Sequence, residues 1–491
     1  MSKQSAKDSV QCMENHTLLQ SIKSTREKIR LESNAMNGSG ISPESLDNDK
    51  KMLECLVQTH SNYFWTTIGG MKHGPLEQIF LLAPPVPPPG CWEHRSEYEE
   101  FRHAIVGVCS MWRRVALNIH PLWTNVGYWE GVPLAWIQLI LDHSDRLPLR
   151  LDIWISELIN NTETSPQVPT SSFLHTWPIL KPHLNRLTQL HAFFPDHIRG
   201  YTHLHHMIMH GFPPNLTHLH IVVAEFYDDD GAQQTMESRR IIIPTPNTLS
   251  FFSYSIREDQ TLIDLHSFAP TTITHLQLVH LSPKEAFSLA EKCPCLLHLD
   301  YTTYEEYGGR ESDRRILLPS THTVLLSGEA AVNSFFDTIR AINIHTLGLG
   351  STHSLPMSAL RTNMVLQHMH INPNNIEWPI LHQFLKRTRV KDVMWRNGTQ
   401  ITALAGLPNL RSVSVDALMW KDSQHYWVDF NRARNLLGKC GIQINLVLEY
   451  CGLMGMEHNA CRKWMVKEQK RHSGHVICTW LLEGPEHPAG W

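Results

Sequence analysis

Histidine is the residue type whose number and spacing in this chain could support chemistry. The sequence has 491 residues and contains 32 histidines. Seven of them alternate with aliphatic residues, at His191, His218, His220, His275, His298, His368 and His370. An imidazole ring donates and accepts hydrogen bonds, gains a charge near pH 6.5, and ligates transition metals. What these rings can do therefore depends on the elements that position them.

A six-residue pattern that recurs along the chain contains these histidines. Aliphatic or aromatic residues occupy its first, fourth and sixth positions, as at Leu216, Leu219 and Ile221. The copies start at Leu187, Leu216, Leu249, Ile273, Leu296, Ile344, Leu366, Val390 and Leu410, and a weaker copy starts at Thr321. Successive starts are roughly 20 to 33 residues apart, which with the L-x-x-L-x-L core is typical of leucine-rich repeats. We predict an α/β fold, an irregular leucine-rich-repeat solenoid with a curved parallel sheet and helices or loops outside it.

The repeat pattern places the histidines on one face of the predicted sheet. Side chains alternate across a strand, so residues between the buried aliphatics should project from the concave face. We predict that a target protein is bound by His218, His220, His275, His298, His368 and His370. The affinity of such a face should fall near pH 6 as the rings become charged. A solvated face that binds no ligand is the other interpretation.

A metal site is a further alternative for the histidines. His206 and His210 are four residues apart, as two ligands on one helix face would be, but no carboxylate or thiolate is clustered with them. A C-terminal set has spacings that match no compact zinc finger; it comprises Cys451, His458, Cys461, His472, His475 and Cys478. We predict no metal and no cofactor.

Composition and missing motifs exclude several classes of function. The formal net charge is −4, which argues against a protein that binds nucleic acid or a membrane surface over a wide area. The chain lacks a phosphate-binding G-x-x-x-x-G-K-[ST] loop, a G-x-S-x-G elbow, an H-E-x-x-H pair and paired C-x-x-C motifs. No apolar run approaches the roughly 18 residues of a membrane helix. We therefore expect a soluble, unsecreted protein of the cytoplasm or nucleus that is not an enzyme.

Four regions follow from these patterns. The sequence predicts a polar helical region at residues 1–66 and a small helical module at residues 67–125. Residues 126–450 predict the repeat solenoid, which begins with a helix and a strand near 147–155 and ends with a strand at 442–448. Residues 451–491 predict a tail that is helical in part and otherwise loose.

Residues of the helical module resemble a known family. Leu76, Ile79 and Phe80 are followed by a run that includes Val108 and Trp112, and then by Pro121, Leu122 and Trp123. With the repeats that follow, the chain resembles the F-box/leucine-rich-repeat-like proteins abundant in mushroom-forming fungi. It departs from the family where the box should open with Leu-Pro and an acidic-aliphatic pair, because residues 69–75 carry glycine and proline instead.

The resemblance implies a substrate-receptor subunit of a cullin–RING ubiquitin ligase. Such a protein docks on the ligase adaptor through the box, thereby joins the cullin scaffold, and holds a target protein on its repeats. By motif match, adaptor contacts are expected at Pro75, Leu76, Ile79, Phe80, Val108, Cys109, Trp112 and Trp123. The alternative is a repeat scaffold that binds protein without recruiting a ligase. An identity for the target does not follow from the sequence.

Overall fold

A computed structural model gives the fold of this chain. It describes residues 73–81, 93–129, 132–155, 171–195, 197–224, 240–256, 262–268, 271–303, 315–340, 343–350, 354–361, 364–371, 376–396, 401–416, 435–448 and 476–480, and isolated helical positions between Ser21 and Met52. The predicted polar helices of 1–66 and most of the predicted tail lie outside these residues. The chain divides into two units, residues 1–85 with 101–119, and residues 86–100 with 120–491.

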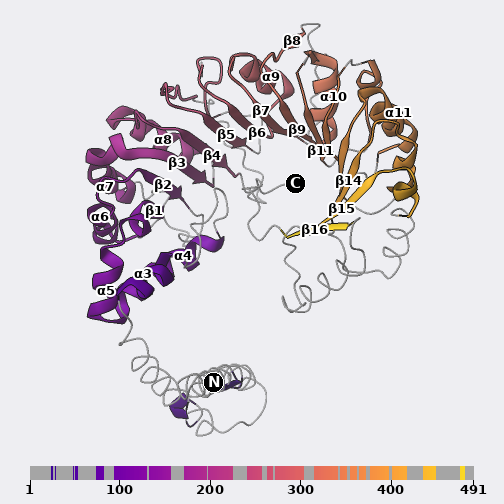
Figure 1. Ribbon diagram of the computed structural model, residues 1–491. Coiled ribbons are helices and arrows are strands. Elements are labelled where there is room, and N and C mark those ends of the chain that lie inside the picture. The colour runs from indigo at the N-terminus through magenta and orange to yellow at the C-terminus, as the bar shows by residue number, and fades with distance from the viewer. Residues whose placement is uncertain are drawn as a thin grey trace, which may run out of the picture. The chain divides into compact units, whose positions relative to one another are not determined.

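The second unit is built on one sheet of fourteen parallel strands, arranged side by side in chain order (Figure 1). The strands are β1 (Asn125–Trp129), β2 (Leu149–Trp154), β3 (Leu187–Phe194), β4 (His218–Val223), β5 (Phe251–Ile256), β6 (His275–Val279), β7 (His298–Thr302), β9 (Thr323–Ser327), β11 (Thr346–Gly350), β12 (His368–Ile371), β13 (Asp392–Arg396), β14 (Ser412–Asp416), β15 (Gln443–Leu448) and β16 (Val476–Trp480). All ten copies of the six-residue pattern supply a strand, so the prediction of a solenoid-like α/β fold with a parallel sheet is confirmed.

Helices return the chain from one strand to the next on the outer side of this sheet (Figure 1). They are α6 (Leu134–His143), α7 (Ser171–Leu180), α8 (His197–His210), α9 (Pro283–Glu291), α10 (Glu329–Thr338) and α11 (Trp378–Thr388), with short 3-10 helices at His120–Trp123, Lys181–Arg186, Ala359–Arg361 and Ile401–Gly406. A separate two-stranded parallel ladder joins β8 (Ile316–Leu317) and β10 (Ile339–Arg340). Such connections stack each repeat on its neighbours, which a repeat needs because it cannot bury its apolar face alone.

The fourth position of the pattern forms a continuous buried row. Leu219 of β4 is in register with Phe252 of β5, which is in register with Leu276 of β6, and the row continues to Val413 of β14. These side chains are at most 1% exposed. Phe287 of α9 packs edge-on against Tyr301 of β7, with ring centroids 5.3 Å apart. The aliphatic pattern therefore faces the helices, and the alternate positions face the inner side of the sheet.

The sheet is longer than the array of copies. At its beginning β1 pairs with β2, and β2 pairs with β3, so two strands precede the first copy of the pattern. The strand near 147–155 was predicted and is β2, whereas β1 was not. At the end, the predicted strand at 442–448 is β15, and it pairs with β16 inside the region predicted as a tail.

Side-chain hydrogen bonds connect neighbouring repeats where the strands begin. Asn215 donates to the carbonyl of Asn185 at 2.8 Å. The hydroxyls of Thr248 and Thr272 donate to carbonyls of the preceding repeat, at 2.8 and 2.7 Å. Backbone carbonyls that would otherwise lack donors are thus satisfied. Short polar residues before each strand therefore fix the spacing of the repeats.

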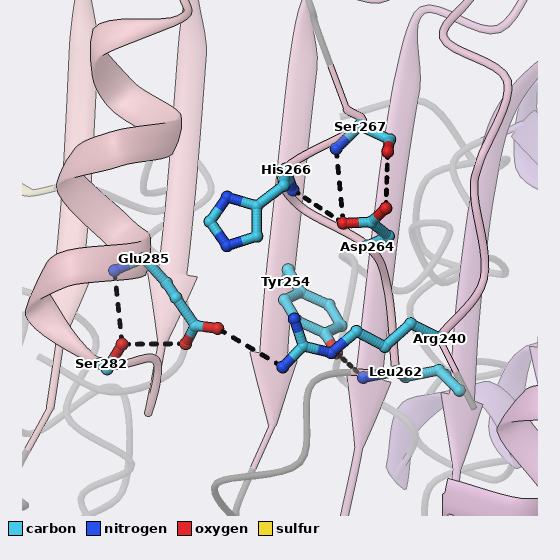
Figure 2. Close-up of polar contacts among 8 residues, drawn as sticks. All are labelled: Arg240, Tyr254, Leu262, Asp264, His266, Ser267, Ser282 and Glu285. Carbon is cyan, nitrogen blue, oxygen red and sulfur yellow. Dashed lines mark hydrogen bonds and ion pairs between the residues drawn. The ribbon is translucent and has the colours of Figure 1, made fainter. Parts of the chain in front are cut away.

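Tyr254 and Leu262 form a polar contact in the core between β5 and the following segment (Figure 2). The Tyr254 hydroxyl accepts a hydrogen bond from the backbone N–H of Leu262 at 2.8 Å. Burial raises the pKa of Tyr254 above its ordinary value. Just beyond Leu262, Asp264 accepts from the backbone N–H of His266 at 3.0 Å and so closes a turn. The long connection between β5 and β6 is held in this way.

Ser282 caps the first turn of α9 (Figure 2). Its hydroxyl accepts from the backbone N–H of Glu285 at 3.3 Å and donates to the Glu285 carboxylate at 2.9 Å. The other carboxylate oxygen of Glu285 lies 4.0 Å from Arg240. The S-x-x-E spacing is that of a capping box, with Pro283 at the first helical position, but the Glu285 carboxylate accepts from the Ser282 hydroxyl and not from its backbone N–H.

Replacing Ser282 with alanine should lower the free energy of unfolding by about 1 kcal/mol, because it removes this cap. Urea unfolding followed by circular dichroism measures the change. Ser282→Asn should restore most of the loss, since asparagine also caps. An equal loss for both variants would contradict the capping role.

In the first unit, α3 (His73–Leu81) packs on α5 (Ser110–Leu117) and on the C-terminal part of α4 (Glu93–Val108). The Phe80 ring meets Trp112 edge-on at 5.1 Å and Phe101 at 6.3 Å between centroids. Cys109 separates α4 from α5 and accepts from the backbone N–H of Trp112 through its sulfur at 3.4 Å. Three aromatic rings thus form the core of this helical unit.

Candidate functional site

Two in-register rows of residues, most of them polar, run across the inner face of the sheet. The first row comprises Gln189, His218, Phe251, His275, His298, Thr323, Thr346, His368, Asp392 and Ser412. The second row comprises Asp152, His191, His220, Ser253, Gln277, Asp300, Leu325, Gly348, His370, Met394 and Ser414. All six histidines that the sequence singled out therefore belong to two in-register rows.

Four neighbouring members of the first row stack their rings, and we call them the ring strip: His218, Phe251, His275 and His298. Their successive centroids are 5.5, 6.5 and 5.6 Å apart, and successive ring planes are 25°, 31° and 22° from parallel. His275 is exposed, and the other three are partly exposed. The ring strip is thus a continuous aromatic surface that crosses β4 to β7 and remains accessible at His275.

Threonine hydroxyls fix the tautomer of two rings in the strip. Thr274 Oγ1 lies 3.2 Å from the carbonyl oxygen of Ser250 and 2.9 Å from His275 Nδ1. A carbonyl cannot donate, so the single hydroxyl hydrogen lies in the contact between the two oxygens. His275 Nδ1 must then carry the hydrogen it donates to Thr274, which leaves Nε2 of the neutral ring as the acceptor. Thr217 makes the same pair of contacts beside His218, both at 2.9 Å.

Asp152 begins the second row and interacts with two basic side chains. Its Oδ1 accepts from Arg150 Nε at 2.8 Å and lies 2.9 Å from His191 Nδ1. The side chains of Asp152 and His191 are each only 2% exposed. The carboxylate is therefore an internal anchor between β2 and β3, where it is withdrawn from any bound partner.

His220 follows His191 in the second row and differs from the ring strip. The two rings meet edge-on at 5.9 Å. Both ring nitrogens of His220 are buried, and neither has a hydrogen-bond partner in the part of the chain that the structure describes. The residue as a whole is half-buried, and its contact with a target protein stays a prediction.

Burial changes the expected pH dependence of this face. It lowers the pKa of His298 to about 4, with a smaller contribution from His275, and burial also lowers the pKa of His275. For His220, burial first and then His191 lower the pKa to about 3. His298 and His220 are therefore neutral through the pH 6 region in which the sequence alone would have them titrate.

The remaining two predicted histidines lie in a separate group. His368 Nδ1 is 3.3 Å from Asp392 Oδ2, and Ser412 donates to the other oxygen of Asp392 at 2.6 Å. His370 is in the second row, on the same strand as His368. Strands β9 and β11 carry no ring in either row, so they separate this group from the ring strip. One histidine-lined surface was expected, and the structure has two.

The predicted adaptor contacts divide into buried and accessible residues. Leu76 and Phe80 are at most 2% exposed, and Trp112 is buried with them in the helical unit. Val108 and Cys109 are half-buried at the junction of α4 and α5, and Pro75 lies in α3. Ile79 of α3 has 46% of its surface exposed. Of the predicted contacts with a described side chain, Ile79 is thus the most accessible.

Trp123 falls in the second unit. It is fully buried, and its ring meets Trp136 of α6 edge-on at 5.9 Å. Trp136 in turn donates to Glu99 at 3.2 Å, and Tyr98 donates to the carbonyl of Leu122 at 3.1 Å. Leu122 and Trp123 of the P-L-W segment therefore belong to the core at the start of the repeat unit.

Sequence reasoning missed Phe251 and Asp152. Phe251 occupies the third position of its copy, as His218 and His275 do in theirs, so alignment of the copies by register would have found it. Asp152 lies in the predicted strand near 147–155, in register with His191 and His220 at the fifth position of their copies, but no leucine pattern marks β2 as a repeat. Neither position can be identified from the polarity of its own residue alone.

Metal binding finds no support among the described residues, where no group of three or more histidine, cysteine, aspartate or glutamate side chains could hold an ion. The rings of His206 and His210 do approach each other on α8, with centroids 4.2 Å apart. The C-terminal set lies outside the described residues except for Cys478 of β16. In the same part of the chain, no helix is long and apolar enough to cross a membrane.

Comparison of the chain with protein-family models and with curated proteins found no match. The function is therefore argued from the residues themselves.

Proposed function

We propose that this chain is an F-box substrate receptor of a cullin–RING ubiquitin ligase, acting in the cytoplasm or nucleus without an active site of its own. A small helical unit would dock on the ligase adaptor, which joins the receptor to the cullin. The inner face of the repeat sheet would hold the target protein. The observation that carries the proposal is the accessible ring strip on a rigid parallel sheet, because such a face supplies binding surface rather than a catalytic cavity.

Adaptor docking in this proposal uses the exposed apolar side chains of α3. Ile79 and Leu81 each have 46% of their surface exposed, whereas Leu76 and Phe80 point into the core of the helical unit. Exposed aliphatic anchors of this kind can carry most of the energy of a helix-face interface. Phe80 and Trp112 would then act indirectly, by holding α3 on α5.

Replacing Ile79 with aspartate should abolish recovery of the adaptor by the purified chain. The change places a charge in an apolar contact without disturbing the Phe80–Trp112 core, because Ile79 lies at the surface. Affinity capture with recombinant adaptor measures it. Gln78→Asp, at the exposed neighbouring position, introduces the same charge and should leave capture unchanged. Failure of the unmodified chain to recover the adaptor would sink the ligase role.

The alternative, a repeat scaffold without ligase recruitment, is favoured by the position of Trp123. A residue that the family motif assigns to adaptor contact is instead fully buried against Trp136 in the repeat unit. Under this alternative the inner face still binds protein, and only the adaptor experiment separates the two functions.

A further inference from the structure

Inner-face positions on strands β4 to β7 carry hydrogen-bond acceptors and no cation. Three in-register rows supply twelve side chains, namely His218, Phe251, His275, His298, His220, Ser253, Gln277, Asp300, Val222, Ser255, Val279 and Thr302. None of the twelve is lysine or arginine, and Asp300 is the one formal charge among them. An anionic partner would find no complementary charge at these positions, whereas a cationic partner would meet no repulsion.

Ser253 and Gln277 use hydrogen-bond donors within this surface. Ser253 donates to Gln277 Oε1 at 2.9 Å, and Gln277 Nε2 donates to Asp300 Oδ2 at 3.3 Å. This chain of hydrogen bonds runs across β5, β6 and β7 and includes the Asp300 carboxylate, which is 4% exposed. The second row thus directs these hydrogens toward Asp300 and away from the ring strip.

The exposed side of the strip presents an acceptor. His275 donates through Nδ1 to Thr274, so its Nε2 carries a lone pair, and the residue is exposed. His298 lies beside it on the next strand, with its ring stacked at 5.6 Å. A ligand with N–H donors and no acceptor is complementary to this arrangement, and guanidinium and ammonium groups are such ligands.

We propose that the ring strip binds an extended segment of the target protein that carries arginine or lysine side chains. This deepens the proposed function, since it names the chemistry of the target, and it holds equally for the scaffold alternative. Neighbouring strands are about 5 Å apart, so a segment that crosses β6 and β7 places one cationic side chain within reach of both His275 and His298. The hydrogen bonds are charge-assisted and therefore stronger than neutral ones.

The test uses the full chain and two labelled ten-residue peptides, one alternating glycine with arginine and the other alternating glycine with glutamate. Fluorescence anisotropy at pH 7 should show binding of the arginine peptide and not of the glutamate peptide. The double variant His275→Phe, His298→Phe keeps the stacked rings, as Phe251 already does in the native row, and removes the acceptors. It should weaken binding by about tenfold or more.

Thr346→Val is the matched control, because it changes a first-row residue outside the strip at almost constant volume. It should leave the affinity of the arginine peptide unchanged. The single variant His275→Phe provides a second measurement should the double variant fail to fold, and it should also weaken binding because it removes one acceptor.

Equal binding of the two peptides, or unchanged affinity in the His275 and His298 variants, would overturn the inference. So would tighter binding of a single-stranded oligonucleotide than of the arginine peptide. Adaptor capture is measured on the same samples. If the native chain binds the arginine peptide and does not capture the adaptor, the ligase role alone is refuted. If it captures the adaptor and does not bind the peptide, this inference alone is refuted.

Discussion

Replacing Asp152 with alanine should lower the free energy of unfolding by about 3 kcal/mol or more, the largest loss we expect from a single polar side chain. Asp152 is 2% exposed and accepts from Arg150 at 2.8 Å, with His191 Nδ1 at 2.9 Å. Its removal would leave the Arg150 guanidinium without this acceptor, and it would remove the carboxylate that lies beside His191 Nδ1 inside the sheet. The cost of a buried group left unpaired exceeds the value of the contact itself. The shift in the urea midpoint, followed by tryptophan fluorescence, measures the loss.

Asp142→Ala is the matched control for this experiment. Asp142 lies at the exposed surface of α6 and accepts from Gln138 at 2.7 Å. Its loss should change the stability by no more than about 0.5 kcal/mol, as is usual for surface positions. Asp152→Asn keeps one oxygen acceptor and should fall between the two. Similar midpoints for Asp152→Ala and Asp142→Ala would show that the buried carboxylate has no structural role.

The buried side of the sheet could be predicted from the sequence in detail. Leu219, Leu276 and Leu299 recur at a fixed place in their copies, and burial of an apolar row in stacked repeats leaves them one face to occupy. The weak copy at Thr321 was found in the same way, because Val324 and Leu326 keep the spacing. Apolar periodicity is thus a sufficient signal wherever a strand is covered by helices on one side.

The sequence predicts which residues lie on the polar side of the sheet, but it does not predict their exposure or their hydrogen bonds. Alternation placed His218 and His220 on the inner face, yet His275 is exposed while both ring nitrogens of His220 are buried. The difference in exposure arises from neighbours on other strands, such as His191. These neighbours are far away along the chain, so the sequence does not reveal their contact with His220. The same holds for the Thr274 contact that sets the tautomer, since the carbonyl of Ser250 completes it.

The resemblance to the family did not predict which of its motif residues are exposed. Phe80, Trp112 and Trp123 were expected as docking contacts and are buried, the first two in the helical unit and Trp123 in the repeat unit, because large aromatic side chains contribute most to a core. Motif matching cannot distinguish a residue that touches a partner from one that supports the helix that does. Ile79 separates the two roles, since it is exposed beside buried Phe80.

His220 should make the protein lose stability as the pH falls from about 6.5 toward 3. In the unfolded chain this ring takes up a proton near its ordinary pKa of 6.5, whereas burial lowers its pKa in the folded chain to about 3. Stability is therefore complete above pH 6.5 and declines below it, because only the unfolded state gains the proton. The total contribution is on the order of a few kcal/mol. His191, Asp152 and Arg150 face the ring from β2 and β3, and the uncharged Ser253 faces it from β5.

His220→Phe keeps the edge-on contact with His191 and removes the titrating group. Urea midpoints measured between pH 7.5 and 4.5 should fall less steeply for this variant than for the native chain. At pH 7.5 it should be at least as stable, because a phenyl ring leaves no buried nitrogen without a partner. His220→Gln guards against a packing effect of the larger ring, and it should flatten the curve in the same way. Parallel curves for the native chain and both variants would mean that His220 is already charged or exposed when folded, and the account of the second row as a neutral, buried support for the ring strip would fail with it.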